Sequence, residues 1–321
     1  MFKGSVIEPS DFTIFSTAEY GNCFTLDVDW IKATGSGLKN GVCLVLNVER
    51  QEYLPDSSTG YGVRMVVHEK GTMPLPQNEG LTLSTEYETS IGLRMVQINR
   101  LGGKYGSCTD GEDFLKKHQL NYTVALCYTM CEISLTELEC GCTPVSTPDV
   151  YDTDVSVCDI VNYTIRSCVE NVNGRVLNRY VECDCPTRCS EQVYTYSFSG
   201  RKWPHEQYLY VLINEVCRRN YTQPFYTDLC QRYEKYNLTD YDVKMMFGNF
   251  MAVNVYFEDL NYDLMQEEPL YNTVRFLSDI GGTMGLFTGA SALTYCEILQ
   301  IIVEIGIFFR NRRRQTVNNI N

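Results

Sequence analysis

The sequence has little of what most enzymes and nucleic-acid-binding proteins need. Only 3 of its 321 residues are histidine, and it contains no HExxH, GxSxG or P-loop pattern and no carboxylate pair in a recognisable catalytic setting. The sequence therefore gives no support for an enzymatic function, and we expect no cofactor. Positive charge is also scarce, because 27 Lys and Arg stand against 40 Asp and Glu, for a net charge of −13. This balance argues against a nucleic-acid partner and agrees with an attraction for cations, although many extracellular domains are acidic for solubility alone.

The first residues lack an export signal. The segment MFKGSVIEPSDFTIF has no basic region followed by a long apolar stretch, and it has no apolar run of about 20 residues that could act as a membrane helix. An exported domain needs one of the two. If the rest of the chain indicates export, we therefore expect the chain to be truncated at its N-terminus.

Cysteine, by contrast, is abundant. Fourteen of the 15 cysteines precede residue 279, and ten of them lie between Cys108 and Cys189. Such a density is typical of disulfides in an oxidising compartment. Zinc is the alternative, but the close pairs have the spacing CxC rather than CxxC and histidine is rare, so we expect disulfides and no metal site. The close pairs are Cys140 with Cys142 and Cys183 with Cys185.

The spacing of the cysteines suggests how part of the chain is linked. Cys127 and Cys131 are four residues apart, so on a helix they point to the same side and can be joined to a parallel strand or to a second helix. Residues 180–189 contain three cysteines that could pair with this first set. Cys217 and Cys230 lie away from the main cluster, and we expect them to pair with each other.

Residues 279–309 form a long apolar stretch. After Asp279 it contains only two formal charges, Glu297 and Glu304, and it is long enough to cross a hydrocarbon core of roughly 30 Å at about 1.5 Å per helical residue. We therefore expect a transmembrane helix here. Small residues recur every four positions and would let another helix approach closely; they are Gly281, Gly285 and Gly289.

The two glutamates of this stretch are unusual for a plain anchor. Glu297 and Glu304 are seven residues apart, so on a continuous helix they share a face, with Gln300 between them. Carboxylates that face lipid are costly, which favours a face directed at a helix bundle or at water. The alternative is a single-pass anchor whose glutamates lie near the cytoplasmic headgroups and extend into them.

Charges on either side of the stretch predict its orientation. Four arginines lie within residues 310–314 and acidic residues precede the stretch, so the positive-inside rule places residues 310–321 in the cytoplasm and residues 1–278 outside the cell. With this topology the missing export signal predicts N-terminal truncation, and Cys23 would have lost its disulfide partner with the missing part.

Four Asn-x-Thr sequons in the outer part are candidate glycosylation sites: Asn121, Asn162, Asn220 and Asn237.

The residues before the stretch predict an α+β fold, and they are numerous enough for one large or two modest domains. Short runs rich in Val, Ile, Leu and Met, separated by Gly, Pro, Asp and Ser, predict an antiparallel sheet. Residues 113–139 have mixed spacings and predict short helices held by disulfides rather than by a deep core. A second β-rich segment follows, and within it residues 249–260 alternate and predict a strand with one buried face. The first runs lie at residues 41–48, 62–68 and 91–98.

Several segments match one protein family. The segment DIGGTMGLFTGAS at residues 279–291, followed by Leu293, Thr294 and Glu297, resembles the second transmembrane segment of the degenerin, epithelial sodium channel and acid-sensing ion channel family. Other landmarks of the family occur in its order along nearly the whole chain: GNCFT at 21–25, YGSC at 105–108, CDCPTRC at 183–189, Trp203-Pro204, and FEDLNY at 257–262.

The resemblance implies a subunit of a trimeric, voltage-independent, sodium-selective channel of the plasma membrane that amiloride blocks. Such subunits have two transmembrane helices with an extracellular domain between them, built from a β-sheet palm, a β-ball and a helical thumb, here about residues 108–190. A homo- or heterotrimer in a lipid bilayer, with sodium as the permeant ion, is expected. The implied thumb disulfides are Cys108–Cys189, Cys127–Cys185, Cys131–Cys183, Cys140–Cys168 and Cys142–Cys158.

The resemblance also assigns a selectivity filter. The Gly-x-Ser motif of the family falls on Gly289, Ala290 and Ser291, where small residues with accessible carbonyls could line a narrow pore. On an unbroken helix Gly289 would lie roughly 80° from Glu297, and a break at the filter would remove this conflict.

Further roles follow from the same resemblance. Glu297 and Glu304 would be carboxylates of the inner pore that enrich cations. Ser278 matches a position at which side-chain bulk affects gating, and Tyr105 takes the place of an aromatic residue that couples the thumb to the pore.

The sequence also departs from the family. It has no counterpart of the first transmembrane helix, of the cytoplasmic N-terminus or of most of the finger region, and Gln300 replaces an acidic residue of the acid-sensing members. Cys43, Cys217 and Cys230 are additions to the usual set. A single-pass, disulfide-rich adhesion or receptor ectodomain and a non-conducting modulatory subunit therefore remain alternatives.

Overall fold

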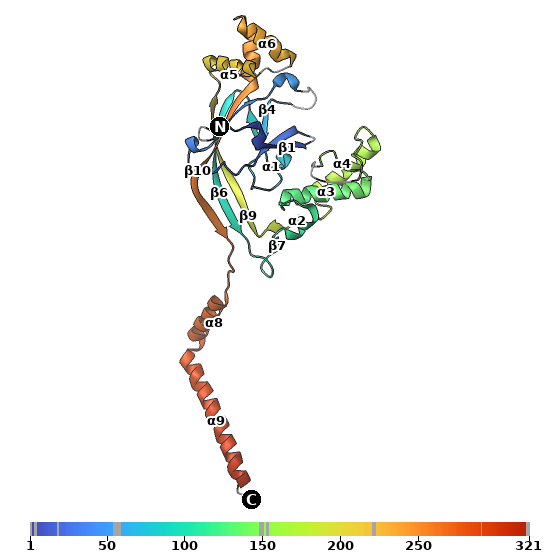
Figure 1. Cartoon of the computed structure of the whole chain (residues 1–321). Helices are drawn as coiled ribbons and strands as arrows, with labels where there is room; N and C mark the ends of the chain where they lie inside the picture. The colour runs from blue at the N-terminus through green and yellow to red at the C-terminus, as the bar shows by residue number, and fades with distance from the viewer. Residues whose placement is uncertain are drawn as a thin grey trace. The chain divides into compact units, whose positions relative to one another are not determined.

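The computed structural model describes residues 2, 5–17, 19–53, 59–147, 151, 154–219, 223–289 and 291–318 (Figure 1). The chain divides into two compact units, Met1–Glu267 and Glu268–Asn321. The first is a mixed α and β domain with six disulfides, and the second is helical. The α+β class agrees with the sequence prediction. The end of the extracellular domain at residue 278 stays a prediction.

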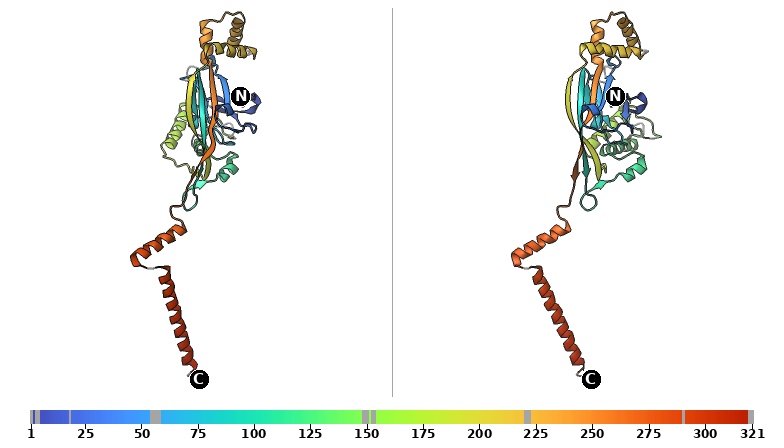
Figure 2. Two further views of the ribbon diagram at one scale, coloured as in Figure 1. Left: turned by 90° about the vertical axis from the view of Figure 1, so that its left-hand side faces the viewer. Right: turned by 60° about the vertical axis from the view of Figure 1, so that its left-hand side comes forward.

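A four-stranded sheet forms the centre of the first unit (Figures 1 and 2). Its order is β3-β10-β6-β9, and β10 runs parallel to β6 while the other neighbours are antiparallel. The prediction of an antiparallel sheet is thus wrong for the central pair. β6 and β10 are both antiparallel to β9, so they are parallel to each other. The strands are β3 (Val42–Asn47), β10 (Phe250–Gln266), β6 (Tyr87–Asn99) and β9 (Ser190–Lys202).

The long strand β10 contains an irregular segment. Residues 258–261 are left out of the pairing with β6, where they stand opposite Arg94 alone. Glu258, at the start of this segment, accepts hydrogen bonds from Arg94 Nε at 2.6 Å and from the Ser197 hydroxyl. The carboxylate of Glu258 therefore ties the irregular segment to both β6 and β9, and these hydrogen bonds hold its pKa below the usual range.

A small sheet of β4 (Gly62–Met65) and β5 (Leu81–Ser84) packs against the central sheet. The buried side chains between them are Leu83, Ile91, Leu93, Met251 and Val253. The alternation of residues 249–260 predicted one buried face, but the first five residues of β10 are all buried. Both faces are covered there because Phe250 belongs to a separate helical core, described below.

Residues 108–189, called the thumb from here on, fold into helices that lie beside the sheet (Figure 1). At the base of the thumb, β7 (Cys108–Thr109) pairs in parallel with β8 (Thr187–Arg188). Five disulfides link the outgoing helices to the returning chain, and they are the five pairs that the resemblance implied. The helices are α2 (Glu112–His118), α3 (Val124–Cys140) and α4 (Tyr163–Leu177).

The apolar core of the thumb is small. Leu126, Met130 and Ile133 of α3 are buried against Leu75, which precedes the short helix α1 (Pro76–Glu79). Thr123 caps the start of α3, because its side chain accepts a hydrogen bond from Leu126 N.

Three helices fill the connection between β9 and β10 and lie at one end of the sheet (Figure 1). They are α5 (Glu206–Arg218), α6 (Pro224–Glu234) and α7 (Asp240–Asn249). No secondary structure was predicted from the sequence for residues 206–248, and the β-rich segment predicted after the cysteine cluster, residues 249–260, lies in β10 apart from its first residue. The apolar residues of α5 recur at helical spacing and are buried together with residues of the other two helices: Leu209, Leu212, Ile213, Val216, Tyr226, Leu229, Met246 and Phe250.

Two polar links support these helices, which we call the α5–α7 cluster. The disulfide Cys217–Cys230 joins α5 to α6, as the sequence predicted. The Asp242 carboxylate is almost fully buried and accepts hydrogen bonds from Arg232 Nε at 2.9 Å and Arg232 Nη2 at 2.7 Å. Burial acts to raise the pKa of Asp242, but the hydrogen bonds from Arg232 and Thr239 outweigh it and hold the pKa below its usual value.

The remaining elements of the first unit are short. β1 and β2 form an antiparallel hairpin, in which burial raises the pKa of the Cys23 thiol. These elements are β1 (Phe12–Thr17), β2 (Gly21–Leu26), and the 3₁₀ turns Pro9–Asp11, Leu38–Asn40 and Arg50–Glu52.

The second unit consists of α8 (Thr273–Thr288) and α9 (Ala292–Asn318). Both helices pass the boundaries that the sequence suggested at residues 279 and 309. Within the part of the chain that the structure describes, none of the helices combines the length and the apolarity needed to cross a membrane.

Candidate functional site

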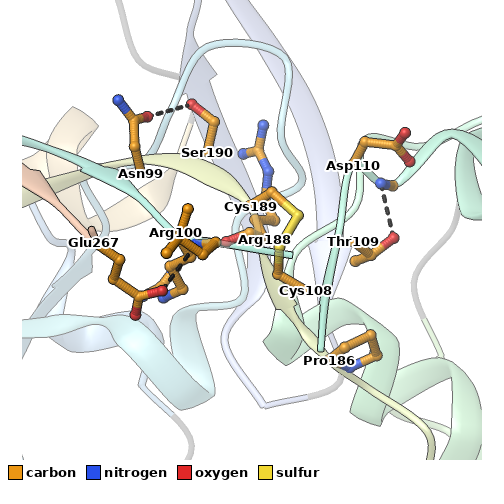
Figure 3. Close-up of a disulfide and its surroundings, with 12 residues drawn as sticks. Asn99, Arg100, Cys108, Thr109, Asp110, Pro186, Arg188, Cys189, Ser190 and Glu267 are labelled. Carbon is orange, nitrogen blue, oxygen red and sulfur yellow. Dashed lines mark hydrogen bonds between the residues drawn. A yellow bond between two sulfur atoms is a disulfide. The ribbon is translucent and has the colours of Figure 1, made fainter. Parts of the chain in front are cut away.

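Residues 100–107 join β6 to β7. Residues 101–107 of this segment include Tyr105 and are called the Tyr105 loop here. The disulfide between Cys108 and Cys189 closes its far end, with the two Cα atoms 4.9 Å apart (Figure 3). A side chain at Gly102 would place its Cβ 3.2 Å from Cys108 Sγ, so the loop passes directly over the disulfide. The loop is therefore held close to the base of the thumb.

Arg100 fixes the near end of the same loop. Its main-chain N–H donates to the carbonyl oxygen of Cys189 at 2.7 Å, and its Nη1 donates to the carbonyl oxygen of Arg188 at 2.9 Å. Its Nη2 forms an ion pair with Glu191 Oε1 at 2.6 Å, with the Arg100 side chain only 22% exposed. A single arginine therefore ties the end of β6 to the junction of β8 and β9.

Glu267, which directly follows β10, contacts the same region from the side of β6 opposite to β9. Its main-chain N–H donates to the carbonyl oxygen of Asn99 at 2.9 Å. Its carboxylate Oε2 accepts a hydrogen bond from the main-chain N–H of Leu101 at 2.8 Å (Figure 3). The last residue of the first compact unit therefore holds the first residue of the Tyr105 loop.

Tyr105, the residue to which the resemblance assigns a coupling role, is presented to solvent. Its side chain is 51% exposed, and the Lys104 ammonium lies 4.9 Å from the centre of its ring. Its main-chain N–H lies 3.4 Å from the carbonyl oxygen of Gly102, which closes a tight turn. The site thus offers an aromatic side chain on a short loop whose two ends are firmly tied.

The second part of the candidate site is the break between α8 and α9. Gly289 ends α8 in the left-handed conformation, with φ of 64°, and its N–H donates to the carbonyl oxygen of Gly285 at 3.0 Å. Ser291 precedes α9, and its hydroxyl lies 3.2 Å from Thr294 Oγ1. The helices separate at the residues where the sequence analysis expected a break, and Ala290 lies outside the described residues.

The carboxylates proposed for the inner pore lie on α9. Glu304 Oε1 accepts a hydrogen bond from Gln300 Nε2 at 2.9 Å, one helical turn away. Glu297 lies on the same helix, and Ser278 lies on α8; the side chains of both residues are exposed. Their roles stay predictions.

The sequons occupy different surroundings. Asn121 Nδ2 donates to the carbonyl oxygen of Gly71 at 2.7 Å, and Asn162 caps α4 through its side-chain oxygen. Asn237 is exposed after α6, whereas Asn220 lies outside the described residues.

Sequence reasoning missed Arg100 and Glu267. The side chains of both residues bond to main-chain groups, and neither residue belongs to a motif with a fixed spacing. One signal was available: Pro269 follows Glu267 by two residues, and a proline cannot donate to a strand ladder.

Comparison with known proteins gives a consistent result. The sequence profile described as "Amiloride-sensitive sodium channel" matches residues 1–301. The chain is 28% identical to degenerin mec-10 of Caenorhabditis elegans, over 92% of this chain and 38% of the relative. It is 29% identical to the epithelial sodium channel subunit alpha of Xenopus laevis, over 93% of this chain and 45% of the relative.

A third relative is the FMRFamide-activated amiloride-sensitive sodium channel of Cornu aspersum, with 26% identity over 100% of this chain and 63% of the relative. The chain therefore spans between about two fifths and two thirds of the length of these relatives. Because the profile covers most of its residues, the chain belongs to the amiloride-sensitive sodium channel family, a family of channels and not of enzymes, as the sequence predicted.

Proposed function

We propose that this chain acts as a subunit of a sodium-selective, amiloride-sensitive channel of the plasma membrane. Residues 1–278 face the outside, residues 279–309 form the pore segment and residues 310–321 lie in the cytoplasm. The observation that carries the proposal is the helix break at Gly289 and Ser291 inside the region that matches the family. Backbone that leaves the helix at this depth has carbonyl groups free to contact a permeant ion.

The proposed conduction path uses residues on both sides of the break. Gly289, Ala290 and Ser291 form the selectivity filter, and Glu297 and Glu304 raise the cation concentration at the inner end of the pore. Three such subunits, identical or related, surround one path for sodium. The apolar residues between 280 and 309 face lipid or neighbouring helices.

The proposed gating path begins in the first unit. An extracellular stimulus rearranges the thumb and the central sheet, and the movement reaches the pore segment through Tyr105 and β10. Ser278 lies just outside the pore segment, where side-chain bulk affects opening. The two-ended anchoring of the Tyr105 loop supports this path, because a firmly tied loop transmits displacement better than a free one.

The test is co-expression of the chain with a full-length relative and measurement of amiloride-sensitive sodium current. We expect Ser291→Leu to lower this current at least about tenfold or to change the sodium-to-potassium permeability ratio, because a bulky side chain obstructs a narrow filter. Leu286→Ala, on the exposed surface of α8, is the matched control and should leave the ratio unchanged.

The alternatives give different results in the same experiment. A single-pass ectodomain would reach the cell surface without associating with the relative or altering its current. A non-conducting modulatory subunit would associate and alter the size of the current, but Ser291→Leu would have no effect on selectivity. Either result would contradict a pore-forming role for this chain.

A further inference from the structure

The hydrogen-bond ladder between β6 and β10 ends in an unusual way. Gln266 is paired with Asn99, and Glu267 N–H donates to the carbonyl oxygen of Asn99 at 2.9 Å, as a regular parallel ladder requires. The next donor after the end of β6 is the N–H of Leu101, and in a continuing ladder its acceptor would be the main-chain carbonyl of Glu267. It bonds instead to Oε2 of the same residue at 2.8 Å. The side-chain carboxylate of Glu267 thus replaces the main-chain carbonyl as the acceptor of the next hydrogen bond.

The sequence explains why the ladder stops at this residue. Donors of one strand toward the same neighbour recur at every second residue, so the donor on β10 after Glu267 would be residue 269. That residue is proline and has no N–H group. The main chain is therefore free to leave the sheet after Glu267, while the carboxylate still provides an acceptor for the N–H of Leu101.

The anchored group is the first residue of the Tyr105 loop. Of the anchors described above, the disulfide and Arg100 connect the loop region to the thumb and to the junction of β8 and β9. Glu267 is the anchor that comes from β10. A carboxylate acceptor makes a stronger hydrogen bond than a neutral carbonyl, so this contact resists separation of the loop from the end of the strand.

We propose that Glu267 is a positioning residue whose carboxylate keeps the Tyr105 loop attached to the end of β10, so that the two move together where the chain continues to Glu268. The inference rests on the proposed channel function only for its consequence in gating. The attachment itself is a property of the first unit and can be measured without any current.

Hydrogen exchange on the full chain in lipid nanodiscs tests the attachment. Mass spectrometry of peptides that span residues 97–107, with fragmentation to single amides, reports the N–H of Leu101. Glu267→Ala removes the acceptor, and we expect exchange at Leu101 to become about tenfold faster, as the loss of a charge-assisted hydrogen bond implies. Glu267→Gln keeps an oxygen acceptor in the same place and should stay within about threefold of the unmodified chain.

Glu268→Ala is the matched control, because it removes a neighbouring carboxylate that takes no part in this ladder. Unchanged exchange at Leu101 in Glu267→Ala, or equal acceleration in Glu268→Ala, would overturn the proposal. If Glu267→Ala does not accumulate as folded protein, Glu267→Met keeps the length of the side chain without an acceptor and is judged by the same criterion.

Current recordings test the consequence separately. In co-expression with a full-length relative, Glu267→Ala should change the rate of channel opening or closing at least about threefold, and Glu267→Gln should restore it. Faster exchange at Leu101 with unaltered rates of channel opening and closing would contradict a role of Glu267 in gating. If the unmodified chain neither associates with the co-expressed relative nor alters its amiloride-sensitive current, the proposed function fails, while the exchange result still decides whether Glu267 holds the loop.

Discussion

The thumb and the α5–α7 cluster are both helical, yet they are stabilised in different ways. The thumb buries three large apolar side chains of α3 against Leu75 and contains five disulfides. The α5–α7 cluster buries eight such side chains around a single disulfide. Where the buried apolar surface is small, covalent links must restrict the unfolded chain instead. The thumb is thus a set of helices held by covalent cross-links, and the α5–α7 cluster is a small conventional core.

The sharpest way to break this comparison is to remove one disulfide from each region. Cys131→Ser with Cys183→Ser removes one of the five thumb disulfides, and we expect it to lower the free energy of unfolding of the thumb by about 2–4 kcal/mol, the usual effect of losing one native disulfide. Limited proteolysis and hydrogen exchange in α3 would measure this loss.

Cys217→Ser with Cys230→Ser is the control for that experiment. Its link spans only 13 residues and lies over a well-packed core, so α5 should keep its slow exchange. Rapid exchange throughout α5 would show that the α5–α7 cluster depends on its disulfide as much as the thumb does.

Truncation of a buried apolar side chain tests how much the α5–α7 cluster depends on its core. Leu229 is fully buried in the α5–α7 cluster, and Leu229→Ala should lower the free energy of unfolding by about 3 kcal/mol, because it leaves a cavity. Urea unfolding followed by tryptophan fluorescence would report this loss, since Trp203 packs against the same core. Tyr236→Ala, at a side chain that is 99% exposed, should change the free energy by less than about 0.5 kcal/mol.

The buried ion pair adds a pH-dependent term to the α5–α7 cluster. The pKa of Asp242 lies below its usual value in the folded chain, so the pair stabilises the fold above the pKa of an unfolded aspartate, about 3.9, and this stabilisation is lost as the pH falls below it. Asp242→Asn should cost about 2 kcal/mol at pH 7.

The difference between Asp242→Asn and the unmodified chain should shrink as the pH is lowered from 7 to 3, because the unfolded aspartate then takes up a proton more readily than the folded one, whose pKa is lower. Urea unfolding at several pH values would measure it. A difference that stays constant over this range would mean that the charge of Asp242 is not what stabilises the helices.

The smallest expected effect concerns the start of a thumb helix. Thr123 caps α3 by accepting a hydrogen bond from Leu126 N at 3.1 Å, and Thr123→Ala should cost about 1 kcal/mol. Thr123→Ser keeps the hydroxyl and should cost little. If Thr123→Ala leaves proteolysis of the thumb unchanged, the disulfides alone determine its stability.

The cysteines made the thumb the most predictable region. Cysteine spacing predicted short stapled helices, and the family resemblance implied five pairs that the structure contains. Helix α5 was missed, although Leu209, Leu212, Ile213 and Val216 recur at the spacing of an amphipathic helix. No secondary structure was predicted there, and the burial of this apolar face against α6 and α7 becomes visible only in the folded chain.

The central sheet shows a different limit. Residues 91–98 and 249–260 were predicted as strands, and β6 and β10 contain them with longer bounds. Their parallel pairing depends on where β9 and the three helices place the chain, and no local pattern encodes that direction. In the same way, Arg100 and Glu267 act on main-chain groups, so their roles become visible only when the strand ends lie side by side.

The irregular segment of β10 limits how this strand can change in length. From Phe257 to Tyr262 the pairing advances five positions along β10, while from Leu93 to Met95 it advances two along β6. Since side chains alternate between the two faces of a strand, this odd excess moves the even-numbered residues of β10 onto the face that Phe257 occupies. Deletion of one residue from 258–261 would leave four positions between Phe257 and Tyr262, and regular alternation then places both side chains on the same face. A single deletion is therefore compatible with the present pairing of Tyr262 with Met95, whereas deletion of two residues leaves an odd excess and still needs an irregular segment.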